Sequence, residues 1–392
     1  MVSLILKSGK DQSVKRFHPW VFSGAIKKIN GPVSEGDLVS VYSNQHEFLG
    51  IGHYQPGSIA VRIISFIESI PNKDFWYSKI DNAINLRNKL RLLNNNETNV
   101  FRLINAEGDG LPGLIIDYYN GVAVMQMHSV GMYLIREQLA EILKEILGNK
   151  FLAVYDKSEK TLPFKANLSN KNGFILGDSE NNIVKEYGLQ FKIDWESGQK
   201  TGFFIDQREN RELLKKYADK RDVLNMFCYT GGFSVYALQG GAKSVHSVDS
   251  SARAIDMTEE NISINFPDVP NHTSFATDAF DYLKDIKDKY DLIILDPPAF
   301  AKHRETLGRA LKGYKRINAR AFEQIRPGGI VFTFSCSQVV SKEKFREAVF
   351  SAAAISGRNV RILNQLTQPA DHPVNIYHLE GEYLKGLVLY VE

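Results

Sequence analysis

The sequence NMFCYTGGFS, residues 225–234, closes an apolar segment with a glycine turn and then continues into a helical pattern. A glycine pair at such a turn lets the backbone approach a ligand that a Cβ would exclude, and the helix N-terminus that follows presents N–H groups to it. The spacing differs from G-x-G-x-x-G, the dinucleotide-binding pattern. The turn therefore predicts a ligand crevice of another kind at the end of this strand.

The chain around this turn alternates short apolar strands with amphipathic helices. Strands are predicted at 223–227, 244–249, 273–277, 292–295 and 329–334, and helices at 232–238, 252–265, 279–286 and 310–325. This alternation is typical of a parallel sheet with helices on both faces, whose ligand crevice lies at the carboxyl ends of the strands. We therefore expect an α/β, Rossmann-like domain over residues 195–392.

Two smaller domains are expected before it, because a chain of 392 residues exceeds the size of about 250–300 residues at which one core stops growing. Residues 1–70 contain short strands at 4–6, 38–42, 48–53 and 59–66, which indicates a small β-rich module. Residues 71–194 combine helices at 74–93 and 132–147 with strands at 113–117, 122–127, 152–155 and 188–193. This pattern predicts an α+β middle domain.

The composition is that of an ordinary globular protein, with 43% hydrophobic and 24% charged residues. No long apolar run suggests a membrane span, and the N-terminus lacks the core of a signal peptide, so a cytoplasmic location is expected. A net charge of +3 permits a polyanionic partner without indicating one. The two cysteines are too few for a disulfide framework or a four-thiolate metal site, and no metal is expected.

Acidic residues follow the next three strands. Asp249, which precedes Ser250, comes eighteen residues after Gly231, where a carboxylate can accept hydrogen bonds from both ribose hydroxyls of a nucleoside cofactor. Asp278, before Ala279, suits an adenine amino group and also a helix N-cap. The fourth strand stops at Asp296-Pro297-Pro298, whose prolines stiffen the loop beneath a planar base.

This order of glycine turn and acids resembles the class I S-adenosylmethionine methyltransferases. The resemblance implies S-adenosyl-L-methionine as the cofactor. The residues expected to hold it are Asn225, Phe227, Tyr229, Thr230, Gly231, Gly232, Asp249, Ser250, Asp278, Ala279 and Asp296.

Cys336 follows the fifth strand in FTFSCSQ, residues 332–338, at the same sheet edge as Asp296. Carbon 5 of a pyrimidine becomes nucleophilic when a thiolate adds at carbon 6, and a base must later remove the proton from carbon 5. A free cysteine is more often a small buried hydrophobe, but this position favours catalysis by Cys336 beside Asp296. Cys228, inside the glycine turn, is expected to face away from the base and not to be catalytic.

Three further motifs are NAEGDGLPG at 105–113, GQKTGFFIDQR at 198–208 and ADHP at 370–373. With them the whole chain resembles the bacterial PUA-fused 23S rRNA 5-methylcytosine methyltransferases. The resemblance implies a PUA RNA-binding domain at 1–70, Gln207 and Arg208 near the pocket, and 23S rRNA or a large-subunit precursor as the partner. Many such enzymes carry a second cysteine where this chain has Pro298. The base that removes the carbon 5 proton stays open among Asp371, His372, Glu380 and Glu382.

Basic residues cluster after the Asp296 loop and serve either phosphate contact or a solvated helix face. They are Lys302, His303, Arg304, Arg309, Lys312, Lys315, Arg316 and Arg320. We expect Pro297, Pro298, Lys302 and Arg304 to contact the substrate, together with Gln207 and Arg208. The sequence PWVF at 19–22, with lysines and arginine around it, suits single-stranded nucleic acid or the core of a small barrel equally well.

Other functions remain open from the residues alone. Uracil-5 methylation needs the same thiolate chemistry, and an RNA-binding assembly factor would retain the fold without turnover. Methylation of an adenine amino group is less favoured, because Ala299 separates the two prolines from Phe300. An exposed strand edge in the first two domains would allow a homodimer.

Overall fold

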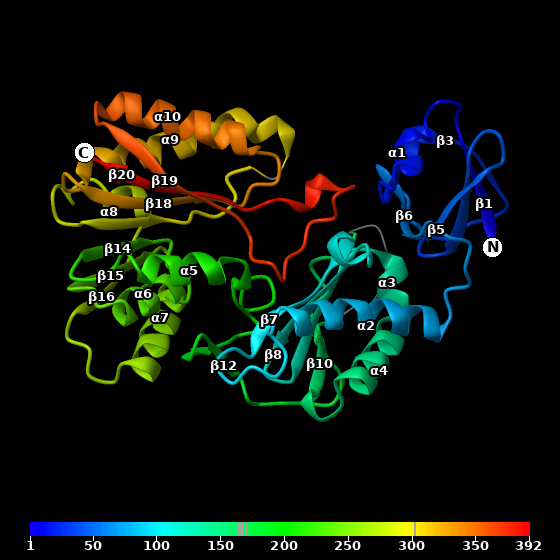
Figure 1. Cartoon of the computed structure of the whole chain (residues 1–392), viewed down its shortest axis with the longest axis horizontal. Helices are drawn as coiled ribbons and strands as arrows, with labels where there is room; N and C mark the ends of the chain where they lie inside the picture. Colours follow the sequence, from blue (N-terminus) through cyan, green and yellow to red (C-terminus); the bar gives the residue numbers. More distant parts are fainter. Residues whose placement is uncertain (164–167, 169–170, 302) are drawn as a thin grey trace. The chain divides into compact units, whose positions relative to one another are not determined.

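The computed structural model spans residues 1–392 and describes all of them except 164–167, 169–170 and 302 (Figure 1). The chain forms two compact units. Unit 1 contains residues 1–188, 193–205 and 370–381, and unit 2 contains residues 189–192, 206–369 and 382–392. Among the described residues, no helix combines the length and apolar character needed to cross a membrane.

Unit 1 begins with a six-stranded sheet in the order β2-β6-β5-β4-β1-β3. Its elements are β1 (Val2–Leu6), α1 (Gln12–Lys15), β2 (Trp20–Phe22), β3 (Ile26–Asn30), β4 (Leu38–Tyr42), β5 (Phe48–Tyr54) and β6 (Ile59–Ser65). Alternate side chains of these strands, such as Val39 and Val41, are fully buried and form a small core. The four predicted strands are confirmed, whereas β2 and β3 were not predicted.

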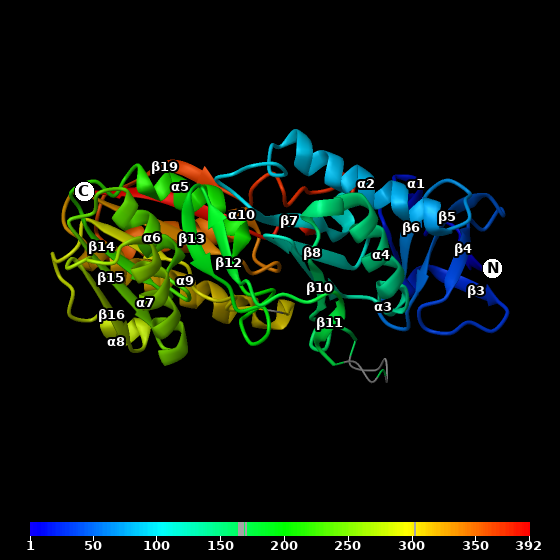
Figure 2. The same ribbon diagram turned by 90° about the horizontal axis from the view of Figure 1, so that it is seen from below.

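The rest of unit 1 contains a five-stranded sheet in the order β11-β10-β9-β8-β7. The elements of this part of the unit are α2 (Lys73–Lys89), β7 (Val100–Asn105), β8 (Leu114–Tyr119), β9 (Val122–Met127), α3 (Val130–Leu134), α4 (Arg136–Leu147), β10 (Ala153–Asp156) and β11 (Gly173–Leu176), with β12 (Ile183–Glu186) outside this sheet. Helices α2 and α4 pack on each other and on the sheet (Figure 2). The predicted helix at 132–147 was wrong in one respect, because it is divided into α3 and α4.

Unit 2 is built on a seven-stranded sheet in the order β16-β15-β14-β17-β18-β20-β19. Its strands are β13 (Leu189–Lys192), outside this sheet, and β14 (Asp222–Met226), β15 (Ser244–Asp249), β16 (His272–Ala276), β17 (Leu292–Leu295), β18 (Gly329–Ser335), β19 (Val360–Leu366) and β20 (Lys385–Val391). Strands β14 to β18 pair in parallel, and β20 runs antiparallel to both of its neighbours. This confirms the predicted Rossmann-like α/β class.

Helices cover both faces of this sheet, as Figure 1 shows. They are α5 (Arg208–Lys215), α6 (Gly232–Gln239), α7 (Ala252–Asn265), α8 (Ala279–Tyr282), α9 (Leu307–Gln324) and α10 (Lys342–Ser356). Val223 of β14 packs in one core with α5 and α6, while the next residue, Leu224, packs in another with α8, α9 and α10. Successive residues of a strand therefore pack into the cores on opposite faces of the sheet, which explains the uninterrupted apolar runs of the central strands.

Candidate active site at the carboxyl ends of the parallel strands

The glycine turn after β14 follows a path that ordinary side chains disfavour. Gly231 has φ +77° and caps α6, and Phe227 and Tyr229 also have positive φ values, of 58° and 49°. A Cβ on Gly231 would lie 2.7 Å from Cγ2 of Thr258 in α7. The turn therefore requires glycine at position 231 for its conformation and for its close approach to α7.

Asp249 connects this turn to the end of β15. Its Oδ2 accepts the N–H of Tyr229 at 3.1 Å, and its Oδ1 accepts the N–H of Ser251 at 3.0 Å. A carboxylate has about four acceptor positions, so these two bonds leave capacity for a pair of hydroxyl groups. The arrangement fits the cofactor role expected for Asp249, because the same side chain orients the turn and offers oxygen acceptors beside it.

Asp278 is the N-cap of α8, as the sequence suggested. Its Oδ1 accepts the N–H groups of Phe280 and Asp281 at 2.8 and 3.1 Å. The side chain is exposed, and the following Ala279 is buried. The cap satisfies helix N–H groups and leaves the second oxygen, Oδ2, for another donor.

Three side chains at the end of β14 and in the glycine turn are buried. Asn225 donates from Nδ2 to Oγ of Ser234 at 2.8 Å and is only 1% exposed. Thr230 is also buried. Burial raises the pKa of the Cys228 thiol to about 12, so this cysteine stays protonated and unreactive near neutral pH. The Oδ1 of Asn225 is buried and has no hydrogen-bond partner among the described residues.

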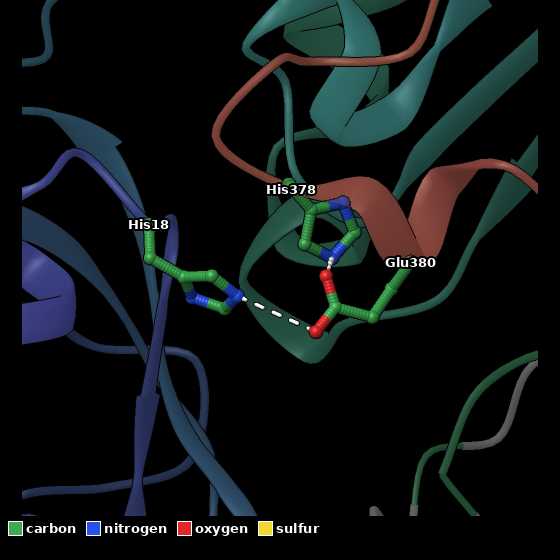
Figure 3. Close-up of side chains that lie close together, drawn as sticks. All are labelled: His18, His378 and Glu380. Carbon is green, nitrogen blue, oxygen red and sulfur yellow. Dashed lines mark ion pairs between the residues drawn. The ribbon is translucent and has the colours of Figure 1, made fainter.

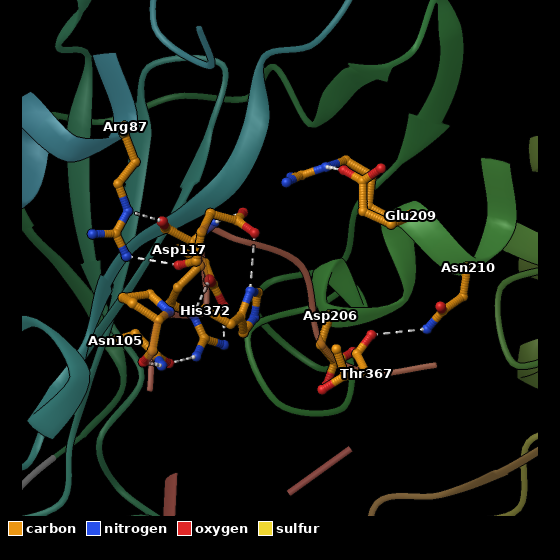
Figure 4. A network of polar contacts seen from close by, with 12 residues as sticks. Arg87, Asn105, Asp117, Asp206, Glu209, Asn210, Thr367 and His372 are labelled. Carbon is orange, nitrogen blue, oxygen red and sulfur yellow. Dashed lines mark hydrogen bonds and ion pairs between the residues drawn. The ribbon is translucent and has the colours of Figure 1, made fainter. Parts of the chain in front are cut away.

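Asp296, which follows β17, is oriented by a chain of amides. Gln207 donates from Nε2 to Oδ2 of Asp296 at 3.0 Å and accepts a bond from Asn210 Nδ2 at 2.6 Å. Asn210 also donates to the carbonyl of Thr367 at 3.4 Å, a contact that Figure 4 draws. Gln207 and Arg208 are each 2% exposed. The structure therefore brings Gln207, expected from the family resemblance, directly to Asp296.

The Asp296 loop continues with Pro297, which is buried, and Pro298, which is exposed. Lys302 lies outside the described residues. Arg304 is exposed and lies in the short 3₁₀ turn before α9. The two prolines and Arg304 thus follow the carboxyl end of β17 in the order expected of a substrate loop.

Two of the basic residues on α9 are already engaged. The Arg316 guanidinium stacks 4.1 Å from the Phe280 ring centroid, and Arg320 pairs with Glu323 at 3.3 Å. For His303, Arg304, Arg309, Lys312 and Lys315, no ion pair with a described carboxylate lies within 4.0 Å. These five side chains, not the whole cluster, are the ones suited to phosphate.

Cys336 is a partly exposed cysteine outside any disulfide, immediately after β18. In the parallel register Leu295 pairs with Thr333, so Asp296 is level with Phe334 and Cys336 follows two positions later. The structure thus places the two expected catalytic residues at the same end of adjacent strands.

The residues beside Cys336 form a polar cluster that the sequence alone did not reveal. The Tyr314 hydroxyl contacts Oγ of Ser335 at 2.9 Å and Oγ of Ser337 at 3.1 Å. Lys385 pairs with Ser335 across β18 and β20, and its Nζ donates to the carbonyls of Ser337 and Tyr383 at 2.6 and 2.7 Å. The one sequence signal was a lysine within the apolar run YLKGLVLYV, residues 383–391.

The motifs at 105–113 and 370–373 meet in a buried polar network within unit 1 (Figure 4). Arg87 pairs with Asp109, and Asn105 donates from Nδ2 to the carbonyl of Pro373 at 2.9 Å. The carboxylate of Asp371, fully buried, accepts the N–H of Arg102 at 2.9 Å and lies 3.1 Å from Nδ1 of His372. These charged residues hold the segment 370–381 in unit 1.

A second polar cluster joins the β-rich module to the same segment (Figure 3). Glu380 lies 3.6 Å from His18 Nε2 and 3.8 Å from His378 Nε2, and ligand atoms of the three residues fall within 4.8 Å of one another. His18 Nδ1 lies 3.2 Å from the Trp20 nitrogen and 3.4 Å from the Trp20 carbonyl oxygen, so this ring nitrogen accepts or donates according to the tautomer. The three side chains thus link the β-rich module to the segment 370–381 within unit 1.

Comparisons with known proteins agree with this architecture. A model of S-adenosylmethionine-dependent methyltransferases matches residues 151–376, and a model of PUA-like domains matches residues 4–66. The chain is 40% identical over 392 residues to ribosomal RNA large subunit methyltransferase I of Alteromonas mediterranea, covering 98% of both chains. It is 38% identical over 395 residues to the protein of that name from Aeromonas salmonicida, covering 99% of both.

The chain belongs to the ribosomal RNA large subunit methyltransferase I family. It is an S-adenosylmethionine-dependent methyltransferase with a PUA-like N-terminal domain, as the sequence indicated. A solved protein from Streptococcus mutans, described as a methyltransferase of this kind, shares the fold with a TM-score of 0.86 and 24% identity over the whole of both chains. In this family member, the turn at Gly231 and the acceptors on Asp249 and Asp278 fit S-adenosylmethionine.

Proposed function

We propose that this enzyme methylates carbon 5 of a cytosine in large-subunit ribosomal RNA, with Cys336 as the nucleophile. The observation that carries the proposal is the partly exposed thiol of Cys336 at the strand end next to that of Asp296. The names of the relatives, ribosomal RNA large subunit methyltransferases, support RNA of the large subunit as the substrate. The expected cofactor residues lie at the same edge of the same sheet.

The reaction begins when the Cys336 thiolate adds to carbon 6 of the pyrimidine, which makes carbon 5 electron-rich. Bound S-adenosylmethionine supplies an electrophilic methyl group. Asp296, held by Gln207 at 3.0 Å, orients the base through hydrogen bonds. A base then removes the proton from carbon 5, and the thiolate leaves as the ring double bond re-forms.

The first test is mass spectrometry of RNA trapped on the enzyme, with S-adenosylmethionine, total ribosomal RNA and either wild-type protein or Cys336→Ala. The proposal expects a covalent adduct and 5-methylcytidine that both disappear in the variant. The matched control is Cys228→Ala, because Cys228 is buried and protonated. If the product is 5-methyluridine, the substrate base is uracil and not cytosine. Methylation that survives in Cys336→Ala would refute the thiolate mechanism. No methylation at all would favour an assembly factor.

We further propose that the RNA lies along the five unengaged basic side chains around the start of α9. Replacing Arg309, Lys312 and Lys315 by glutamine should weaken RNA binding. It should also make the plot of the logarithm of the binding constant against the logarithm of salt concentration less steep, by about 0.7–0.9 for each phosphate that is no longer neutralised. A triple variant at Lys342, Lys344 and Arg346, on α10, is the charge-matched control. Equal effects of the two triple variants would return the α9 cluster to a solvated helix face.

An apolar cavity in unit 1, with a volume of about 490 Å³, is a second proposed RNA contact. Phe17 and Tyr377 line it, are 48% and 52% exposed, and their ring centroids lie 5.3 Å apart. Exposed aromatic rings stack on unpaired bases, each worth about 1–3 kcal/mol. Phe17→Ala or Tyr377→Ala should therefore weaken RNA binding about fivefold or more, whereas Phe350→Ala, at a 73% exposed ring on α10, should not.

A further inference from the structure

Lys385 is a buried charged group in direct contact with the segment that carries Cys336. It is 4% exposed, and it pairs with Ser335, the residue before Cys336, across β18 and β20. Its Nζ donates to the carbonyl of Ser337, the residue after Cys336, at 2.6 Å. Lys385 therefore contacts the backbone on both sides of the thiol that the proposed function makes the nucleophile.

We propose that Lys385 is a positioning residue that holds Cys336 as a thiolate, with its ammonium group as the positive partner of the sulfur. This inference rests on the proposed role of Cys336. It also explains why a lysine occupies the start of a buried strand, since a buried charge is unfavourable unless something compensates it.

The hydrogen bonds of Lys385 support an ammonium group directed at this segment. Two of its three donors go to the carbonyls of Ser337 and Tyr383, and carbonyl oxygens carry only a partial negative charge. Among the described residues, no carboxylate oxygen lies within 4.0 Å of Lys385 Nζ. The ammonium thus lacks a full anionic partner, and a Cys336 thiolate would supply one.

Among the described residues, the charged and titratable groups that act on Lys385 include Cys336, Glu382 and Lys342. Burial lowers the pKa of Lys385 to about 8, and the strongest opposing effect comes from Cys336, ahead of Glu382. Lys342 lowers the pKa of Lys385, whereas Glu382 raises it. Since Lys342 and Glu382 form an ion pair, their effects on Lys385 largely cancel. Burial raises the pKa of Tyr314, which keeps its hydroxyl neutral. Cys336 is therefore the group whose ionisation is coupled most directly to that of Lys385.

The proton balance is simple. Near neutral pH a lysine with a pKa of about 8 is mainly an ammonium, so the proton of the Cys336 S–H bond leaves to solvent and a thiolate remains beside that ammonium. The thiolate adds to carbon 6, and the ammonium stays charged through methyl transfer. When the carbon–sulfur bond breaks, the same ammonium stabilises the departing thiolate. Lys385 would thus favour both the addition and the elimination.

The test measures alkylation of Cys336 against pH, without RNA or cofactor, and follows each cysteine by peptide mass spectrometry. A free cysteine has a pKa of about 8.5, so the wild-type midpoint should lie below that value. In Lys385→Met the midpoint should rise by at least about one unit, which lowers the alkylation rate at pH 7 about tenfold. Lys385→Arg should retain most of the wild-type profile, and Lys344→Met, at an exposed lysine of α10, should leave it unchanged.

Comparing iodoacetate with iodoacetamide adds a readout that a merely structural role would not change. A nearby ammonium attracts the anionic reagent, so the rate ratio of iodoacetate to iodoacetamide should fall in Lys385→Met and not in Lys385→Arg. A wild-type midpoint at or above about 8.5 would overturn the inference even if Lys385→Met fails to fold. So would identical profiles in folded wild-type and Lys385→Met proteins.

These outcomes separate the inference from the proposed function. If the alkylation of Cys336 depends on Lys385 but Cys336→Ala still methylates RNA, the ion pair is supported and the role of Cys336 as nucleophile is refuted. A normal 5-methylcytidine yield with an ordinary cysteine profile would keep the function and refute the ion pair.

Discussion

Replacing Gly231 by alanine tests the link between the glycine turn and cofactor binding. Gly231 has φ +77°, and a left-handed conformation costs a residue with a Cβ about 1–2 kcal/mol. The new Cβ would also lie 2.7 Å from Thr258 Cγ2 and 3.2 Å from Thr258 Cα, and overpacking of this kind costs about 1–3 kcal/mol. Together these effects predict a loss of about 2–5 kcal/mol.

Gly357 provides a control that separates the two contributions. It has a similar φ of 67°, follows α10, and has no atom within 4 Å of the position that a Cβ would occupy. Gly357→Ala should therefore lose only the conformational part, about 1–2 kcal/mol, and keep its cofactor affinity. Gly231→Ala should lose more stability and also bind S-adenosylmethionine at least tenfold more weakly, because Thr258 can be avoided only if the turn shifts.

Denaturant titration measures the two losses of stability, and calorimetric titration with S-adenosylmethionine measures the two affinities. The reasoning is refuted if Gly231→Ala matches Gly357→Ala in both quantities. Equal affinities with unequal stabilities would mean that the turn does not touch the cofactor.

Three other outcomes follow from buried groups. Arg87→Met should destabilise unit 1 by about 3–5 kcal/mol, because the carboxylate of its partner Asp109 stays buried and uncompensated. Lys73→Met, at an exposed ion pair, should cost less than about 1 kcal/mol, and thermal unfolding of both variants measures the difference. Burial lowers the pKa values of His53 and His128 to about 4, so between pH 6.5 and 4 the unfolded state binds protons that the folded state excludes. Urea titrations should therefore show that the protein loses stability as the pH is lowered from 6.5 to 4, and that the loss is smaller in His128→Gln. Cys228 should resist iodoacetamide at pH 8 in the folded protein, since burial raises its pKa to about 12, and rapid labelling would contradict that burial.

The parallel sheet was predictable because its signals are local. Strands β15 and β17 and helix α7 have the predicted bounds, since each apolar run is enclosed by turn residues or by a capping serine such as Ser251. Helix α8 ends at Tyr282 and not at residue 286, because four-residue apolar spacing continues beyond the last helical turn. Strands β19 and β20 escaped prediction because they run antiparallel and carry no βαβ pattern.

The candidate site was predictable where one strand end supplies both position and chemistry. Asp249, Asp296 and Cys336 each lie at the end of a strand or directly after one, so the parallel order alone places them at one edge. Lys385 was missed because it reaches the Cys336 segment through an antiparallel strand that begins 49 residues later in the chain. Asn210 was missed for a different reason, since its role depends on a side-chain bond to Gln207 that no spacing indicates.

The proton on carbon 5 needs an acceptor in the last step of the proposed reaction. The contacts of Asp371, one of the four candidates, bear on its suitability for this role. Each oxygen of Asp371 already has one contact, one with the Arg102 N–H and one with His372 Nδ1, and these contacts hold the segment 370–381. Lys385 is mainly an ammonium near neutral pH, so it has no lone pair for the carbon 5 proton. A group with an accessible lone pair at that moment is required, and His372, Glu380 and Glu382 stay open for this role beside Asp371.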